Sequence, residues 1–185
     1  MKRIVAIMVC IILLSGCAST QSTDRAVLLR QSLLSAESCS FHARITADYG
    51  SVVYQFALAC AVDKNGDIKF SVVEPDSIAG ITGSICGGSG QLHFDDQVLG
   101  FSLLVDEQFS PVSAPWILMK TLRGGFIHTV NQTERGTYVC IDDSFDDDAL
   151  QLDIWLDEKN NPVEAEILWK SRRILSIQIT DFALL

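Results

Sequence analysis

Residues 39–60 read CSFHARITADYGSVVYQFALAC and alternate apolar with polar side chains on both sides of a central turn. This period of two is typical of a β-strand with one face in a core and the other in water. Tyr49 and Gly50 can form the turn between two such strands. The segment therefore predicts an antiparallel hairpin.

The register of this hairpin follows from its turn. If Asp48 faces Ser51, all apolar residues of both strands lie on one face, and a slip of one residue would destroy that agreement. Cys39 then lies directly opposite Cys60, at about 5 Å between Cα atoms, which suits a disulfide. We expect this disulfide; two buried free thiols are the alternative.

The same alternation continues through most of the chain. Residues 64–66, Lys-Asn-Gly, predict a second hairpin loop with Gly66 in the left-handed conformation. Further strands are expected at 68–72, 82–86, 91–94, 98–105, 126–133, 137–141, 150–156, 163–169 and 173–182, which makes eleven in all. Because these segments alternate instead of running continuously apolar, we expect an antiparallel sheet with one wet face.

Two segments have helical periodicity instead. Residues 24–36 place Ala26, Leu29, Leu33 and Ala36 on one face. Residues 111–123 are apolar nearly all round, and a helix of that kind is buried or faces an apolar ligand. Ser113 is expected to cap this second helix, and Gly124 to end it.

The N-terminus has the features of an export signal. Lys2 and Arg3 precede uncharged residues 4–14, a run too short to span a bilayer. Leu14-Ser15-Gly16-Cys17 resembles the bacterial lipobox. That resemblance implies cleavage before Cys17, which would carry diacylglycerol and acyl chains such as palmitate. An ordinary signal with an incidental cysteine is the alternative.

The predicted organisation is thus a signal peptide at 1–16, a lipidated tether at 17–23 and one domain at 24–185. The chain of 185 residues is 48% hydrophobic, which suits a domain with a good core. Its net charge of -9 makes it a poor partner for nucleic acid or an anionic membrane surface. We therefore expect the lipid to hold it to the extracytoplasmic face of a bacterial membrane. For Cys86 and Cys140 the sequence leaves two alternatives: two free thiols, or a second disulfide between them.

A family resemblance rests on the order of these features. They are the helix before the first strand, the loop 74–81 after the third strand, the mid-chain helix 113–123, and the closing segments 161–167 and 177–182. In this order the chain resembles the LolA/LolB-like superfamily of bacterial lipoprotein carriers and receptors, and more distantly the clostridial germination lipoprotein GerS. The resemblance implies a mainly β (α+β) fold, an open antiparallel half-barrel of about eleven strands with both helices covering its concave face.

Two functions are compatible with this resemblance. The leading hypothesis is a non-catalytic lipoprotein that binds a lipid, an acyl chain or another apolar group in the half-barrel. The candidate lining residues are Trp116, Ile117, Met119 and Leu122 from the second helix and Phe56, Leu58 and Phe70 from the strands. The alternative is a GerS-like regulatory module with a filled core and no ligand, in which a sheet edge or the acidic loop docks an envelope protein.

Few residues suggest catalysis or metal binding. His42, His93 and His128 lie far apart in the sequence, at polar-face positions or strand ends, and are expected to be surface residues. The aspartates of residues 142–148 lack the spacing of an EF-hand, so we expect a solvated loop, with Ca²⁺ binding as the alternative. We expect neither an enzyme, nor a metal site, nor a cofactor apart from the lipid on Cys17.

Overall fold

The computed structural model describes residues 18–105 and 108–185. They form an antiparallel sheet of eleven strands, in the order β6-β5-β4-β3-β2-β1-β13-β12-β11-β10-β9, and a separate pair, β7-β8. Helix α2 (Ala18–Ser35) precedes the sheet, and helix α3 (Ala114–Gly124) lies between β8 and β9. The strands are β1 (Ser38–Asp48), β2 (Val53–Asp63), β3 (Ile68–Glu74), β4 (Thr82–Cys86), β5 (Ser89–Phe94), β6 (Gln97–Ser102), β7 (Leu104–Val105), β8 (Gln108–Phe109), β9 (Phe126–Thr133), β10 (Gly136–Asp142), β11 (Leu150–Leu156), β12 (Pro162–Trp169) and β13 (Arg172–Leu184).

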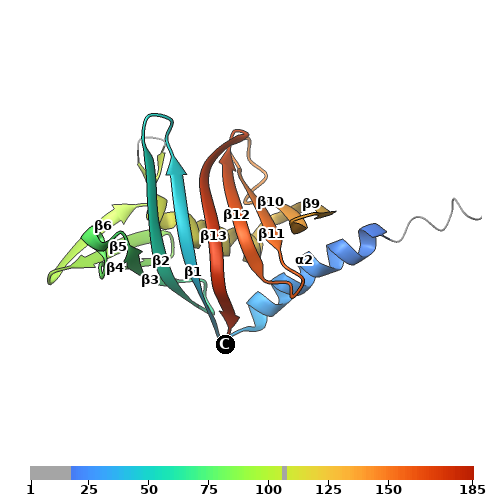
Figure 1. Cartoon of the computed structure of the whole chain (residues 1–185), viewed down its shortest axis with the longest axis horizontal. Helices are drawn as coiled ribbons and strands as arrows, with labels where there is room; N and C mark the ends of the chain where they lie inside the picture. The colour runs from blue at the N-terminus through green and yellow to red at the C-terminus, as the bar shows by residue number, and fades with distance from the viewer. Residues whose placement is uncertain (1–17, 106–107) are drawn as a thin grey trace, which may run out of the picture.

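The chain enters the sheet in the middle (Figure 1). From β1 it moves outward strand by strand to the edge at β6, and it then crosses through α3 to the opposite edge at β9. From there it returns to β13, which pairs with β1. The two edge strands do not pair with each other, so the sheet stays open. This confirms the predicted fold class, an open antiparallel half-barrel with an N-terminal and a mid-chain helix.

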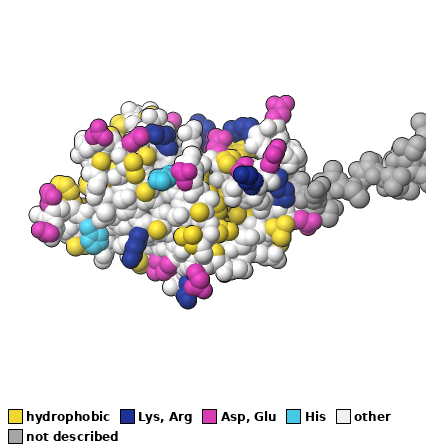
Figure 2. Space-filling view, turned by 60° about the horizontal axis from the view of Figure 1, so that its bottom comes forward, with side chains coloured by type: hydrophobic (Ala, Val, Ile, Leu, Met, Phe, Trp, Pro, Cys, Tyr) yellow, Lys and Arg dark blue, Asp and Glu magenta, His cyan; other side chains and the backbone are white. Residues whose placement is uncertain are grey.

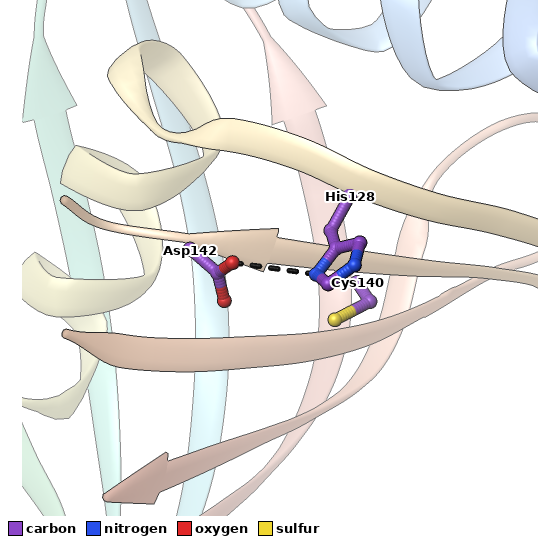
Figure 3. A group of neighbouring side chains, drawn as sticks. All are labelled: His128, Cys140 and Asp142. Atoms are coloured by element: carbon purple, nitrogen blue, oxygen red, sulfur yellow. Dashed lines mark ion pairs between the residues drawn. The ribbon is translucent and has the colours of Figure 1, made fainter. Parts of the chain in front are cut away.

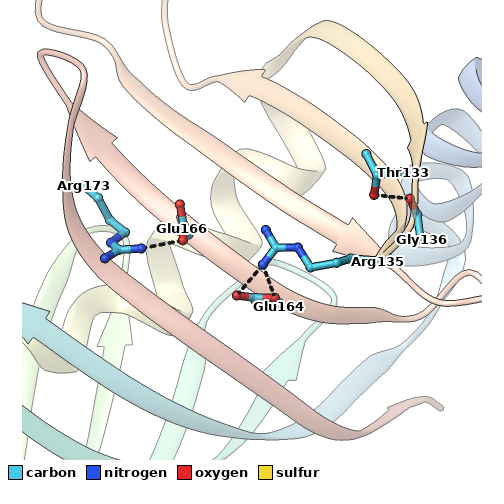
Figure 4. A network of polar contacts seen from close by, with 6 residues as sticks. All are labelled: Thr133, Arg135, Gly136, Glu164, Glu166 and Arg173. Carbon is cyan, nitrogen blue, oxygen red and sulfur yellow. Dashed lines mark hydrogen bonds and ion pairs between the residues drawn. The ribbon is translucent and has the colours of Figure 1, made fainter.

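The two faces of the sheet differ in polarity. The inward side chains of the strands form one hydrophobic cluster with Leu29 and Leu33 of α2 and with the buried side chains of α3. The outward side chains include ion pairs between neighbouring strands, such as Arg173 to Glu166 at 2.8 Å (Figure 4). Exposed pairs of this kind contribute at most about 1 kcal/mol each. The stability of the fold therefore comes mainly from the concave side.

The loop of the first hairpin is longer than predicted. Asp48 pairs with Val53 instead of Ser51. The loop is closed by the Tyr49 amide, which donates to the Val52 carbonyl at 3.1 Å, and by the Gly50 amide, which donates to Oδ1 of Asp48 at 2.8 Å. A shift by two residues returns each side chain to the same face. The predicted faces are therefore right, although the predicted pairs are wrong.

The predicted disulfide between Cys39 and Cys60 is also wrong, for the same reason. Cys39 pairs with Val62, and Cys60 pairs with Phe41, so the two cysteines are diagonal neighbours. Diagonal positions lie about 7–8 Å apart, which is beyond the usual reach of a disulfide. Both residues are buried free thiols, and Cys86 and Cys140 are free as well.

We expect these thiols to differ sharply in reactivity. Burial raises the pKa of Cys39 to about 11 and the pKa of Cys60 to about 12, so both are protonated and covered at neutral pH. Cys86 is exposed. A thiol reagent should label Cys86 in the folded protein, and Cys39 and Cys60 only after unfolding, as read from the masses of the labelled peptides. A peptide map of exported protein that links Cys39 to Cys60 would contradict this register.

The helices also differ from the predicted ranges. Helix α2 is described over Ala18–Ser35, so residues 18–23 of the segment expected as a tether are helical; they contain neither Gly nor Pro to end the helix. Cys17 and the signal at 1–16 lie outside the described residues. Helix α3 follows a 3₁₀ turn at Pro111–Ser113, and Ser113 Oγ donates to the Ser110 carbonyl at 2.6 Å instead of capping the helix. Neither described helix is long and apolar enough to cross a membrane.

Candidate functional site

The residues predicted to line a ligand cavity lie in or beside the hydrophobic core. Six of them are buried, each at most 9% exposed: Ile117, Met119, Leu122, Phe56, Leu58 and Phe70. Trp116 is half-buried and packs against the same cluster. The structure therefore brings these side chains together, but as neighbours in a packed core.

Little space is left between the two helices and the sheet. The gap lined by Leu29, Leu122 and Ile154 has a volume of about 10 Å³. A single water needs about 10–15 Å³, and a drug-sized ligand occupies a pocket of about 300–1,000 Å³. In this part of the half-barrel there is no room for an acyl chain.

The two helices are joined to each other at their C-terminal ends. Arg30 of α2 donates from Nε to the Leu122 carbonyl of α3 at 2.8 Å. In the opposite direction, Arg123 of α3 donates from Nη1 to the Leu33 carbonyl of α2 at 3.1 Å. Each guanidinium thus satisfies a carbonyl that the helix end leaves without an intrahelical partner. Burial lowers the pKa of Arg30. This reciprocal contact fixes both helices over the concave face.

A larger cavity, of about 230 Å³, lies at the side of α3. Its apolar lining includes Trp116, Ile117 and Leu150, and its rim carries carboxylates of the acidic loop, residues 142–148. Lys120 lies on the same rim, 3.6 Å from Asp143 and 5.4 Å from the centroid of the Trp116 ring. Two of the predicted lining residues, Trp116 and Ile117, thus face open space here.

A shallow groove of about 600 Å³ lies on the outer face of β1 to β5. Its lining includes Ala59, Ala61 and Ser71. These side chains are small, so they form a depression in the sheet surface between larger neighbours. At one side His42 Nδ1 lies 3.1 Å from Asp181 Oδ2. Sequence reasoning missed this groove, although the alanines of β2 at outward positions were a signal for it.

Strand β6 forms an exposed edge of the sheet. Within the described residues it pairs only with β5. Val98 is 60% exposed and Leu99 is 66% exposed, and Phe94 at the end of β5 is exposed as well. The segment Gln97–Ser102 contains no charged residue and no proline.

The charged groups are spread over the surface. Figure 2 shows acidic and basic side chains interspersed with hydrophobic ones on the face in view. The acidic loop is tied to neighbouring elements by ion pairs, including Lys170 to Asp148 at 3.3 Å. Phe145 in this loop is 83% exposed, and its ring lies tilted against that of Phe126 with 3.6 Å between centroids.

Comparison with known proteins concerns the fold alone. No protein-family profile matches the sequence, and no curated protein matches it. Among solved structures, an uncharacterized conserved protein from Thermus thermophilus is similar at 11% identity and a TM-score of 0.48, over 88% of each chain. A LolA superfamily protein from Nitrosomonas europaea is similar at 11% identity and a TM-score of 0.44, over 86% of this chain and 93% of that chain.

Lipoprotein LppX from Mycobacterium tuberculosis is similar at 13% identity and a TM-score of 0.44, over 91% of this chain and 96% of that chain. All these TM-scores lie below 0.5, so the resemblance to the LolA/LolB-like superfamily stays a prediction. The likeness to GerS stays a prediction. Fold alone does not assign a function. The choice between lipid binding and docking of a protein therefore depends on the interior and the surface of this chain.

Proposed function

We propose that this chain is a non-catalytic lipoprotein of the bacterial envelope that acts by binding a protein partner at the edge of its sheet. The observation that carries the proposal is the filled concave face. A half-barrel that carries lipid needs a cavity under its helices, and here the gap lined by Leu29, Leu122 and Ile154 is about 10 Å³. The cavity at the side of α3, of about 230 Å³, is too small for a whole lipid. Of the two functions compatible with the resemblance, the interaction module fits this interior better.

The exposed edge at β6 supports the same proposal. Natural sheets protect free edges with charges, prolines or bulges, because an unprotected edge pairs with other strands. Gln97–Ser102 has neither a charge nor a proline, and Val98 and Leu99 are exposed on it. An extended segment of a partner could add to β6 as a further strand, with backbone hydrogen bonds for affinity and side-chain contacts for specificity.

Photo-crosslinking in cells of the native host tests the edge. A photoreactive residue at Val98 should give one discrete protein adduct, and Leu99→Lys in the same chain should abolish it, because an edge lysine opposes strand addition. The matched control is a photoreactive residue at Val53, which is also exposed, at the tip of the first hairpin. No adduct at Val98, or the same adduct from Val53, would overturn the edge-strand proposal.

The membrane anchor is proposed from the lipobox alone. Cys17→Ala should abolish incorporation of a clickable fatty acid and release the protein from the membrane fraction. The acidic chain has little electrostatic attraction to an anionic membrane, so no second anchor is expected to replace the lipid. Retained label and membrane fractionation in the variant would contradict this prediction.

The cavity beside α3 favours a second candidate function. Its apolar floor and volume of about 230 Å³ suit a short apolar group instead of a whole lipid. Trp116 lies in its wall, so its fluorescence should respond to a short-chain fatty acid if the cavity is a binding site. An unchanged signal at saturating fatty acid would leave partner binding as the sole candidate.

A further inference from the structure

A cluster of polar side chains lies on the outer face of the sheet, near the edge opposite to β6. Three side chains with metal-binding atoms meet there: His128 of β9 and Cys140 and Asp142 of β10 (Figure 3). Their ligand atoms all lie within 4.8 Å of one another. From the sequence His128 was expected to be a surface residue, and it is exposed, but it lies beside a carboxylate and a thiol.

A β-bulge brings His128 to this position. Cys140 pairs with Thr129, while the next residue, Ile141, pairs with Ile127. His128 is therefore the extra residue of β9, and bulges of this kind redirect a side chain. On β10 the residues alternate, so Val139 and Ile141 enter the core while Cys140 and Asp142 share the outer face.

The separations suit a small divalent ion. Nδ1 of His128 lies 3.4 Å from Oδ2 of Asp142. A tetrahedral Zn²⁺ with bonds of about 2.1 Å places its nitrogen and oxygen ligands about 3.4 Å apart, and a sulfur ligand about 3.6 Å from the nitrogen. The His128 side chain is 68% exposed, so it is free to make the small rotation that brings it closer to the buried thiol.

The surroundings are acidic. Asp153 of β11 lies directly opposite Cys140 and accepts a hydrogen bond from Gln151 Nε2 at 2.8 Å. Burial and the Asp153 carboxylate raise the pKa of the Cys140 thiol to about 11. A bound cation would take the place of the thiol proton, which passes to the solvent as the sulfur becomes a thiolate ligand. Two carboxylates beside one thiol favour a cation electrostatically.

We propose that His128, Cys140 and Asp142 bind one divalent transition-metal ion, and that Zn²⁺ fits this nitrogen, sulfur and oxygen ligand set best. Three protein ligands leave the fourth position to water. The proposal is independent of partner binding at β6, because the two features lie at opposite edges of the sheet.

Cobalt titration of the reduced full chain in detergent, after removal of metal with a chelator, tests the site. Co²⁺ should bind with one equivalent and give a thiolate-to-cobalt charge-transfer band, and Zn²⁺ should displace it. Cys140→Ser should abolish the band, and His128→Ala or Asp142→Asn should weaken Co²⁺ binding at least about tenfold. His128 is exposed, so His128→Ala should leave the far-ultraviolet circular dichroism unchanged.

Two variants serve as controls. Cys86→Ser and His93→Ala remove an exposed cysteine and an exposed histidine elsewhere on the sheet, and both should bind Co²⁺ like the parent chain. A charge-transfer band that survives Cys140→Ser, unchanged affinity in His128→Ala, or no binding at millimolar Co²⁺ would each overturn the metal site.

Discussion

Met119→Ala should lower the free energy of unfolding by about 2–5 kcal/mol, as expected for removing a large side chain from a packed core. Met119 lies on α3 and is 0% exposed. If its side chain lined an open lipid cavity, truncation would only enlarge that cavity and would cost little. The size of the loss therefore distinguishes a filled half-barrel from an empty one.

Urea denaturation of the two proteins, followed by circular dichroism, measures this difference. The matched control is Leu99→Ala on the exposed edge strand β6, which should change the free energy of unfolding by no more than about 0.5 kcal/mol. A cavity created at Met119 should also bind a small apolar probe that the parent chain does not bind. A loss below about 1 kcal/mol in Met119→Ala would speak against the filled interior.

Gly136→Ala should destabilise the fold by about 2–4 kcal/mol, because the backbone strain of a positive φ adds to a steric clash of the new Cβ. Gly136 has φ +118, and a Cβ built on it would lie 2.2 Å from the Leu156 carbonyl oxygen. The residue begins β10 after the tight turn from β9, where Thr133 Oγ1 donates to the Gly136 carbonyl at 2.8 Å (Figure 4). Neither the turn nor the neighbouring strand β11 can move without breaking pairing.

The control for this glycine is Gly100→Ala. Gly100 lies on β6, has an ordinary φ, and has no atom within 4 Å of a built Cβ. Its substitution should leave the urea midpoint nearly unchanged. Equal midpoints for the two variants would show that the β9–β10 turn is not tightly packed against β11.

The sheet could be predicted from the sequence because alternation is a local signal. Each strand carries its own pattern, so the eleven strands, the second hairpin loop at Gly66 and the buried helix α3 all followed from short segments. The register of the first hairpin did not follow, because the pattern is unchanged by a shift of two residues. The observed loop is closed by the hydrogen bonds of the Tyr49 and Gly50 amides, which the pattern of apolar residues does not reveal.

The candidate sites depend on contacts that sequence spacing does not reveal. His128 meets Cys140 because of a bulge in β9, and a bulge leaves no clear mark in the pattern of apolar residues. Whether the concave face is open or filled likewise depends on how helix α2 packs against helix α3. This packing is fixed by two hydrogen bonds between the helices, one from Arg30 to the Leu122 carbonyl and one from Arg123 to the Leu33 carbonyl. Both bonds join residues far apart in the sequence.

Native mass spectrometry of the protein extracted from its own membrane tests the filled half-barrel most directly. We expect the mature chain with the covalent lipid on Cys17, and with the one metal ion proposed above, but with no second lipid, under conditions gentle enough to keep a noncovalent lipid bound. A second lipid mass that dissociates on collisional activation, and that persists in a variant with a narrowed side cavity such as Ile117→Trp, would contradict the filled half-barrel.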